Sequence, residues 1–150
     1  MQIHHIRVDV VRGGVLEQDV EAVVNAANPS MQGGGGVDCA IHRAAGKALM
    51  EELIEVAPHG AKTGTAVIIG GHQIRKKSIL HTPGPTWKGG GSGEQEKLAF
   101  CSLSTGIYGY PLDRAAPIAV QATADYLKAY PGTSLERVVF AMYREQGYTL

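Results

Sequence analysis

Apolar residues follow two different periods along the chain, and segments of the two kinds alternate. Six short runs rich in valine and isoleucine predict β-strands, because β-branched side chains suit an extended backbone. These runs are Ile6–Val11, Val20–Asn25, Thr65–Ile69, Ser78–Thr82, Ala99–Ser104 and Arg137–Met142. Two longer segments, Asp38–Ala57 and Asp113–Tyr130, predict helices. Strands that alternate with helices predict an α/β fold around a mixed sheet.

The first helical segment has one apolar face and recognisable ends. Its apolar positions recur at a spacing of three to four residues; they are Ile41, Ala45, Leu49, Leu53 and Val56. Asp38 is predicted to be its N-cap, and Pro58 to end it. In the second helical segment, Pro117 is tolerated only near the first turn, because proline has no amide hydrogen to donate.

Length, charge and cysteine content narrow the class of protein. A chain of 150 residues and 15.9 kDa is predicted to form one domain, residues 1–150, with a core of its own. Fourteen basic residues balance fourteen acidic ones, so neither nucleic acid nor an anionic membrane is an expected partner. No apolar run is long enough to span a membrane. Two cysteines and a start unlike a signal peptide predict a cytoplasmic protein.

Candidate chemistry begins where the second predicted strand ends. Asn25 and Asn28 are followed by four consecutive glycines, Gly33–Gly36, and then by Asp38. Consecutive glycines before a helix can turn their amide groups toward an anion. A flexible turn capped by Asp38 explains the same residues without a ligand, and the residues alone leave both interpretations open.

Other candidates carry less weight. The loop at 104–111, directly after a predicted strand, could hold a diphosphate on its backbone amides, but many loops between a strand and a helix have this composition. The six histidines show no spacing typical of a zinc site, so no metal is predicted. His42 lies one helical turn after Asp38, and we expect a structural role for it.

Together these segments resemble the macrodomain family, and within it the MacroD-type branch. The resemblance rests on VVNAANPS at 23–30, GGGGVDCAIHRAAG at 33–46, ILHTPGP at 79–85 and STGIYGYP at 104–111. It implies a three-layer α/β/α sandwich with a mixed central sheet that binds ADP-ribose. MacroD-type members hydrolyse esters of ADP-ribose, namely O-acetyl-ADP-ribose and mono-ADP-ribose on acidic side chains of proteins. The alternative is a reader module that binds ADP-ribose without chemistry. No cofactor is implied.

The resemblance also assigns roles to individual residues. Asp38 matches the catalytic aspartate, and Asn28 matches the residue that hydrogen-bonds the distal ribose. Tyr108 is expected to close over the ribose and Tyr143 to stack against adenine. The remaining expected ligand-binding residues are Gly14, Val15, Asn25, Ala26, Gly35, Gly36, Val37, Ser104, Thr105, Gly106 and Ile107.

The chain departs from the family pattern at two places. Relatives carry Gly-Asp-Ile where this chain has Gly13-Gly14-Val15, so the carboxylate that accepts a hydrogen bond from adenine is absent at Gly14, and neither Glu17 nor Asp19 occupies that position. The connection between about residues 93 and 104 is short by about twenty residues, the length of a helical crossover. A natural deletion there would expose one face of the sheet, so we expect either that a segment is omitted from the sequence or that the chain has been altered.

Overall fold

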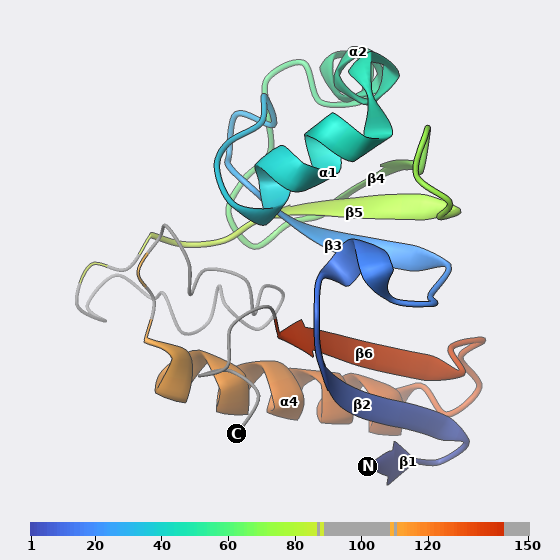
Figure 1. Cartoon of the computed structure of the whole chain (residues 1–150). Coiled ribbons are helices and arrows are strands. Elements are labelled where there is room, and N and C mark those ends of the chain that lie inside the picture. Colours follow the sequence, from blue (N-terminus) through green and yellow to red (C-terminus); the bar gives the residue numbers. More distant parts are fainter. Residues whose placement is uncertain (87, 89–108, 110, 143–150) are drawn as a thin grey trace.

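The computed structural model describes residues 1–86, 88, 109 and 111–142, whose strands form two three-stranded sheets (Figure 1). In the first sheet, β1 (Gln2–Ile3) is antiparallel to β2 (Ile6–Arg12), and β2 is parallel to β6 (Arg137–Met142). In the second, β5 (Ser78–Pro83) lies between β3 (Ala22–Ala27) and β4 (Val67–Gly70). Strand β3 is parallel to β5, and β4 is antiparallel to it.

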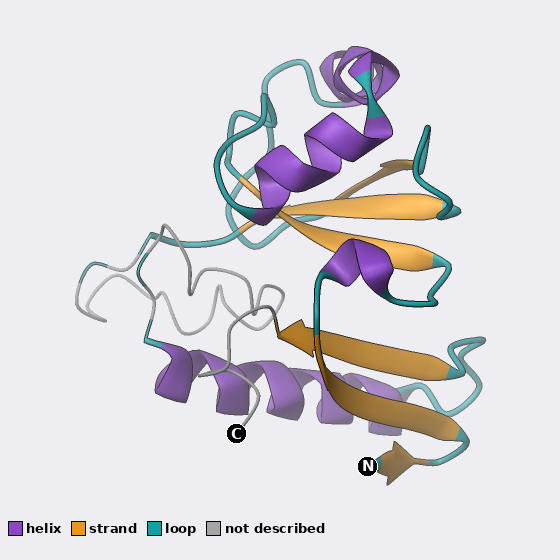
Figure 2. Cartoon of the chain, in the orientation of Figure 1, coloured by secondary structure: helices purple, strands orange, loops and turns teal. Residues whose placement is uncertain are grey.

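Helices cover the two sheets from opposite sides (Figure 2). Helices α1 (Val37–Ala45) and α2 (Lys47–Val56) pack on β3 and β4, while α4 (Leu112–Ala129) runs along the sheet of β1, β2 and β6. A short 3₁₀ helix, η1 (Val15–Glu17), lies in the link from β2 to β3. Helices on both sides of mixed strands confirm the expected α/β/α sandwich.

The first helical segment was predicted as one helix, which is wrong. Gly46 separates α1 from α2 and has φ 82°, a backbone conformation that a residue with a side chain rarely adopts. The predicted N-cap is also wrong, because Gly36 is the N-cap of α1 and Asp38 lies inside its first turn. The apolar spacing continues across Gly46, so periodicity alone did not reveal the break.

Smaller differences concern the other elements. Strand β3 begins at Ala22 and ends at Ala27, so Asn25 lies inside the strand rather than at its end. Pro117 lies in the second turn of α4, whereas we expected the helix to tolerate a proline only near its first turn. Neither β1 nor η1 was predicted. The predicted strand Ala99–Ser104 lies outside the described residues.

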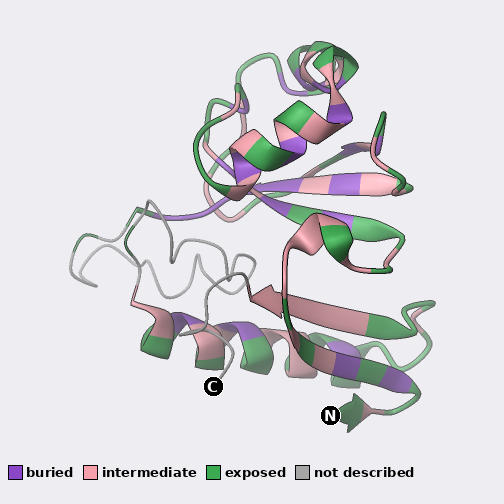
Figure 3. Ribbon diagram, in the orientation of Figure 1, coloured by how far each residue is buried: buried purple, intermediate pink, exposed green. Residues whose placement is uncertain are grey.

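The buried apolar residues form two cores of unequal extent (Figure 3). The larger core lies between the β3–β5–β4 sheet and the helices α1 and α2; its buried members are Val23, Ala27, Met31, Ile41, Ala45, Leu49, Leu53, Ala57, Ile69 and Ile79. The smaller core joins Ile6 and Val8 of β2 to Leu127 of α4. In the described part of the chain, none of the helices has the length and apolar character needed to cross a membrane.

Candidate active site

A buried carboxylate marks the point where the chain leaves β3 and enters α1. Asp38 is only 2% exposed although it lies in the first turn of the helix. Burial of a carboxylate is costly unless hydrogen-bond partners surround it. The side chain of Asn25, from the neighbouring strand β3, supplies one such partner: its Nδ2 donates to Asp38 Oδ1 at 2.6 Å.

Two histidines complete a polar cluster around this carboxylate. His81 is opposite Asn25 in the register of β5 and β3, and its Nδ1 lies 2.9 Å from Asn25 Nδ2. His42, one turn after Asp38 in α1, places Nε2 3.2 Å from Asp38 Oδ1. The two imidazole rings meet edge to face, with their centroids 5.9 Å apart. We refer to Asn25, Asp38, His42 and His81 as the polar cluster.

Burial sets the protonation of one member of the polar cluster. His81 is fully buried, and burial lowers its pKa to about 4, with a smaller contribution from the charge of His42. Removal of water penalises the charged imidazolium, so His81 is neutral at physiological pH. A neutral ring is required for Nδ1 to accept the hydrogen bond from the Asn25 amide.

Asn28 lies beside the free side of the Asp38 carboxylate. Its Nδ2 donates to the carbonyl of Gly33 at 2.7 Å, and its Oδ1 accepts from Ser30 Oγ at 2.6 Å. A Cβ atom placed on Gly34 would lie 3.1 Å from Asp38 Oδ2 and 3.3 Å from Asn28 Nδ2. Both expected catalytic side chains therefore reach the same glycine, and Gly34 leaves the space between them free of a side chain.

The glycine loop leads into α1 with its amide groups uncommitted to the helix. Gly36, the N-cap, has φ 64°, and a Cβ atom there would meet no atom within 4 Å. The first amide that bonds back to the N-cap carbonyl is that of Ala40. The preceding amides, including that of Val37, lie at the positive end of the helix dipole, the setting in which helix N-termini bind phosphates.

A carboxylate lies beside Gly14, the position at which the resemblance led us to expect an aspartate. Glu17 Oε2 accepts a hydrogen bond from the Gly14 amide at 3.0 Å. A Cβ atom on Gly14 would lie 3.2 Å from Glu17 Oε1. The carboxylate of Glu17 therefore lies beside Gly14, a contact that the linear sequence did not indicate.

The structure tests only part of the expected site. It brings together Asp38, Asn28, Asn25 and the glycine loop. Ala26 follows Asn25 in β3, and Val15 in η1 packs against the larger core. Six expected ligand-binding residues lie outside the described part of the chain: Ser104, Thr105, Gly106, Ile107, Tyr108 and Tyr143.

Sequence reasoning missed the two histidines of the polar cluster. His81 occupies an inward position of β5, and Asn25 occupies an inward position in the neighbouring, otherwise apolar strand β3. Two polar residues at buried positions of adjacent strands are a usable signal, because buried polar groups require partners. His42 was assigned a structural role from its spacing, yet its ring contacts Asp38.

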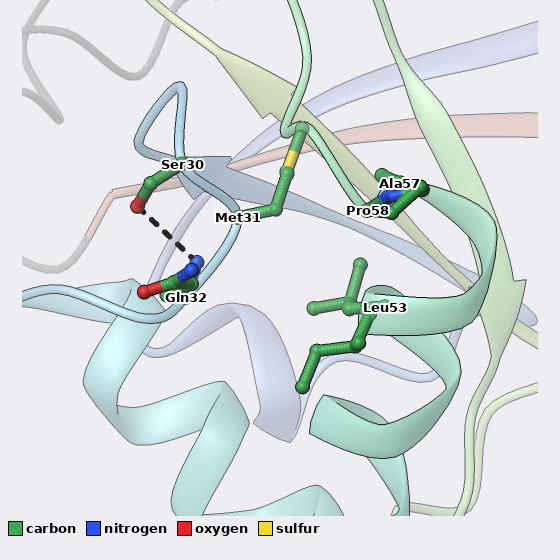
Figure 4. A pocket seen from close by; sticks show the side chains of 7 residues that line it. Ser30, Met31, Gln32, Leu53, Ala57 and Pro58 are labelled. Carbon is green, nitrogen blue, oxygen red and sulfur yellow. Dashed lines mark hydrogen bonds between the residues drawn. The ribbon is translucent and has the colours of Figure 1, made fainter.

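A small pocket lies between the loop that joins β3 to α1 and the end of α2 (Figure 4). It has a volume of about 170 Å³ and is lined by Met31, Leu53 and Pro58 among others. None of its lining residues belongs to the polar cluster. The pocket therefore gives no support to a site at Asp38, which rests on the hydrogen-bonding geometry instead.

Comparisons with known proteins agree with this arrangement. A family model described as Macro domain matches residues 24–99. A Macro domain-containing protein of Caldanaerobacter subterraneus is 40% identical, covering 95% of this chain and 91% of its own. An O-acetyl-ADP-ribose deacetylase of Salmonella newport is also 40% identical, over 93% and 89%. These two alignments, of 163 and 161 residues, are longer than this chain.

Solved structures extend the comparison to three dimensions. The Oceanobacillus iheyensis macrodomain with ADP matches with a TM-score of 0.89 and 32% identity, covering 99% of this chain and 90% of that one. Other matching structures of the same macrodomain carry single substitutions of a glycine by valine, an aspartate by alanine and an asparagine by alanine. With its fold, its motifs and its relatives in agreement, the chain belongs to the Macro domain family.

Proposed function

We propose that this protein binds ADP-ribose and hydrolyses an ester on its distal ribose, with O-acetyl-ADP-ribose as the substrate type. The observation that carries the proposal is the Asp38 carboxylate. Asn25 holds one of its oxygens, while the other, Oδ2, has no hydrogen-bond partner among the described residues and lies beside Gly34 and Asn28. A carboxylate held in this way can accept a proton from a water molecule.

The reaction that fits these groups is addition of water to the acyl carbon. Asp38 orients a water molecule and takes one of its protons as the oxygen attacks the carbonyl. The bond between the acyl carbon and the ribose oxygen then breaks, and the proton passes to that oxygen. The products are a carboxylic acid and ADP-ribose with a free hydroxyl. In this scheme the Asn28 amide positions the ribose, and Asn25 fixes the direction of the carboxylate.

Binding of the diphosphate is assigned to the glycine loop and the start of α1. Backbone amides and a helix dipole bind phosphate without any lysine or arginine, in keeping with the zero net charge of the chain. The Oceanobacillus macrodomain was solved with ADP and, in its glycine-to-valine variant, with ADPR. The asparagine, glycine and aspartate replaced in that protein follow one another at the same separations as Asn28, Gly35 and Asp38 here.

The same chemistry extends to a second class of substrate. Mono-ADP-ribose on an aspartate or glutamate side chain is also an ester of the distal ribose, so water attacks an equivalent acyl carbon. We include proteins modified in this way as candidate partners, and we expect the acyl group to be the only part of the substrate that differs between the two reactions.

Mass spectrometry separates hydrolysis from simple binding. The protein is incubated with O-acetyl-ADP-ribose and, in parallel, with a protein that carries mono-ADP-ribose on acidic side chains; the appearance of ADP-ribose is followed. Calorimetry with ADP-ribose measures binding in the same preparation. Release of ADP-ribose supports the enzyme, whereas measurable binding without turnover would identify a reader module.

A further inference from the structure

The hydrolysis scheme uses Asp38 as its base. Together with His42 and His81, the same residue also forms a set of metal-ligand groups. Asp38, His42 and His81 each offer one ligand atom, and these three atoms lie within 4.8 Å of one another. Asp38 and His42 come from successive turns of one face of α1, and His81 comes from β5 beneath it. Residues four apart on a helix share a face, which converges the carboxylate and the imidazole on one point.

Unpaired polar atoms provide a second, independent observation. Asp38 Oδ2, His42 Nε2 and His81 Nε2 are buried and have no hydrogen-bond partner among the described residues. Although His42 Nε2 lies 3.2 Å from Asp38 Oδ1, the two are not aligned for a hydrogen bond. Asp38 is 2% exposed and His81 0% exposed. Buried polar atoms without partners are rare in folded proteins, and they call for an unseen partner.

The chemistry of these three side chains indicates which metal ion they would bind. Two imidazoles and one carboxylate form the donor set of many zinc sites, with bonds of about 2.0–2.2 Å and a fourth position open to water. Ligand atoms around such an ion are about 3.4 Å apart, close to the 3.2 Å between His42 and Asp38. Asn25, whose Nδ2 donates to Asp38 Oδ1, would orient the carboxylate from outside the first coordination shell.

We propose that Asp38, His42 and His81 form a binding site for a divalent cation of the zinc class. The glycine loop borders the cluster, since Gly33 lies against the His42 ring and Gly34 against the Asp38 carboxylate. A bound cation draws the Asp38 carboxylate away from water. Its occupancy therefore lowers the turnover proposed above, a consequence that rests on the proposed function, whereas the binding itself does not.

Direct binding measurements test the site without reference to activity. Protein stripped of metal with EDTA and dialysed is titrated with Zn²⁺ by calorimetry, and with Co²⁺ by visible absorption. We expect one equivalent to bind and cobalt to show the intense absorption of tetrahedral coordination. In spectra that detect the histidine ring nitrogens of the wild-type protein, Zn²⁺ shifts the resonances of His42 and His81. Unchanged ring resonances at both histidines would overturn the proposal.

A matched pair of variants distinguishes Zn²⁺ binding at this site from nonspecific binding of Zn²⁺ at the surface. His42→Gln removes one ligand and is expected to weaken Zn²⁺ binding by more than about tenfold. His72→Gln is the control, because His72 also lies beside a carboxylate, 2.6 Å from Glu52, but outside the polar cluster. Equal Zn²⁺ affinities of wild type and His42→Gln would contradict the site, as would a loss confined to His72→Gln. Thermal unfolding of both variants verifies that they are folded.

Turnover is measured last, with Zn²⁺ and after addition of EDTA. Inhibition by one equivalent of Zn²⁺ that EDTA reverses supports the regulatory consequence. Full turnover with zinc bound would refute that consequence. If neither sample hydrolyses O-acetyl-ADP-ribose, the proposed function fails, while the binding data still decide on the metal site.

Discussion

The two described sheets, of three strands each, differ in how many buried apolar residues pack against them. The site half, which consists of β3, β5, β4, α1 and α2, contains the larger core and the whole polar cluster. Among the described residues of the α4 half, which consists of β1, β2, β6 and α4, the core cluster is Ile6, Val8 and Leu127, and Ala115 and Ala119 of α4 are also buried. Among the described strands, no hydrogen-bonded ladder joins the two halves.

The larger core of the site half explains how that half can hold buried polar atoms without hydrogen-bond partners. Unpaired buried polar atoms cost stability, and a half that buries many apolar side chains can offset that cost. The α4 half keeps its charges at the surface: Asp9 bonds to Arg7 and Arg137, and these hydrogen bonds hold its pKa below the ordinary value. The polar cluster therefore depends on the packing around it.

Even the site half leaves one sheet face open. Val24, Leu80 and Ile68 form a row across β3, β5 and β4 on the face away from α1, and Val24 is 41% and Ile68 63% exposed. A missing covering segment would leave such a row exposed, whether the segment was deleted naturally or is omitted from the sequence between about residues 93 and 104. The omission stays a prediction, because that region lies outside the described residues.

The largest expected effect compares one aspartate from each half. Asp38→Ala is expected to lower turnover of O-acetyl-ADP-ribose by about 10²–10⁴, the usual contribution of a general base, and to leave ADP-ribose binding within a few-fold. Asp9→Ala removes a carboxylate from the α4 half and should leave turnover unchanged. Steady-state kinetics and calorimetry on both variants measure these effects. Wild-type turnover in Asp38→Ala would show that the residue serves only the structure of α1.

The sequence predicted the site half well in one respect and poorly in another. The resemblance paired Asn28 with Asp38, and the structure places both beside Gly34 because one local loop joins β3 to α1. The contacts of His81 with Asn25 depend on strand pairing between residues far apart in sequence, which no local pattern reports. The break at Gly46 was missed for a related reason: the apolar spacing describes the buried face and not the backbone.

Two buried leucines compare the packing of the halves directly. Leu49 and Leu127 are both 0% exposed, but Leu49 belongs to the larger core and Leu127 to the smaller one. Leu49→Ala is expected to lower the free energy of unfolding by about 4 kcal/mol, and Leu127→Ala by about 2–3 kcal/mol, because a sparse core relaxes around a cavity more easily. Urea unfolding measures both values. Equal losses would show that the α4 half is packed as firmly as the site half.

Acid should weaken the site half through His81. The pKa of His81 is about 4 in the folded protein against an ordinary value of 6.5, so the unfolded chain takes up the proton first as the pH falls. Stability is then lost between pH 6.5 and 4, by at most about 3 kcal/mol, and the loss ends below pH 4.

Unfolding in urea across this pH range, with EDTA present to exclude metals, measures the loss. In His81→Gln the part of the pH dependence due to this ring should disappear, while His72→Gln should retain it. An identical pH profile for wild type and His81→Gln would mean that the buried ring gains its proton as readily in the folded state as in the unfolded one.

The smallest expected effect concerns Glu17, in the link between the two halves. Its carboxylate lies against the Gly14 amide, the position at which the resemblance to the MacroD type led us to expect an aspartate that accepts a hydrogen bond from adenine. We expect Glu17→Gln to weaken ADP-ribose binding by about tenfold, the lower end for a hydrogen bond to a charged group, because Glu17 is exposed to solvent. Asp19→Asn, in the same link, is the matched control and should bind normally.

Comparison of several ligands and variants tests whether Glu17 recognises the amino group of adenine. The loss in Glu17→Gln should be absent for ribose 5-phosphate, which has no base, and for the inosine analogue, whose ring carries a carbonyl in place of the amino group. Gly14 has φ −74° and ψ 147°, a conformation open to any residue, so Gly14→Asp in a Glu17→Ala background should restore the affinity for ADP-ribose. Gly14→Asp alone should gain little, because its carboxylate would meet that of Glu17. If calorimetry finds the same ADP-ribose affinity for wild type and Glu17→Gln, the base is bound without this carboxylate, and the link between the halves takes no part in selecting adenine.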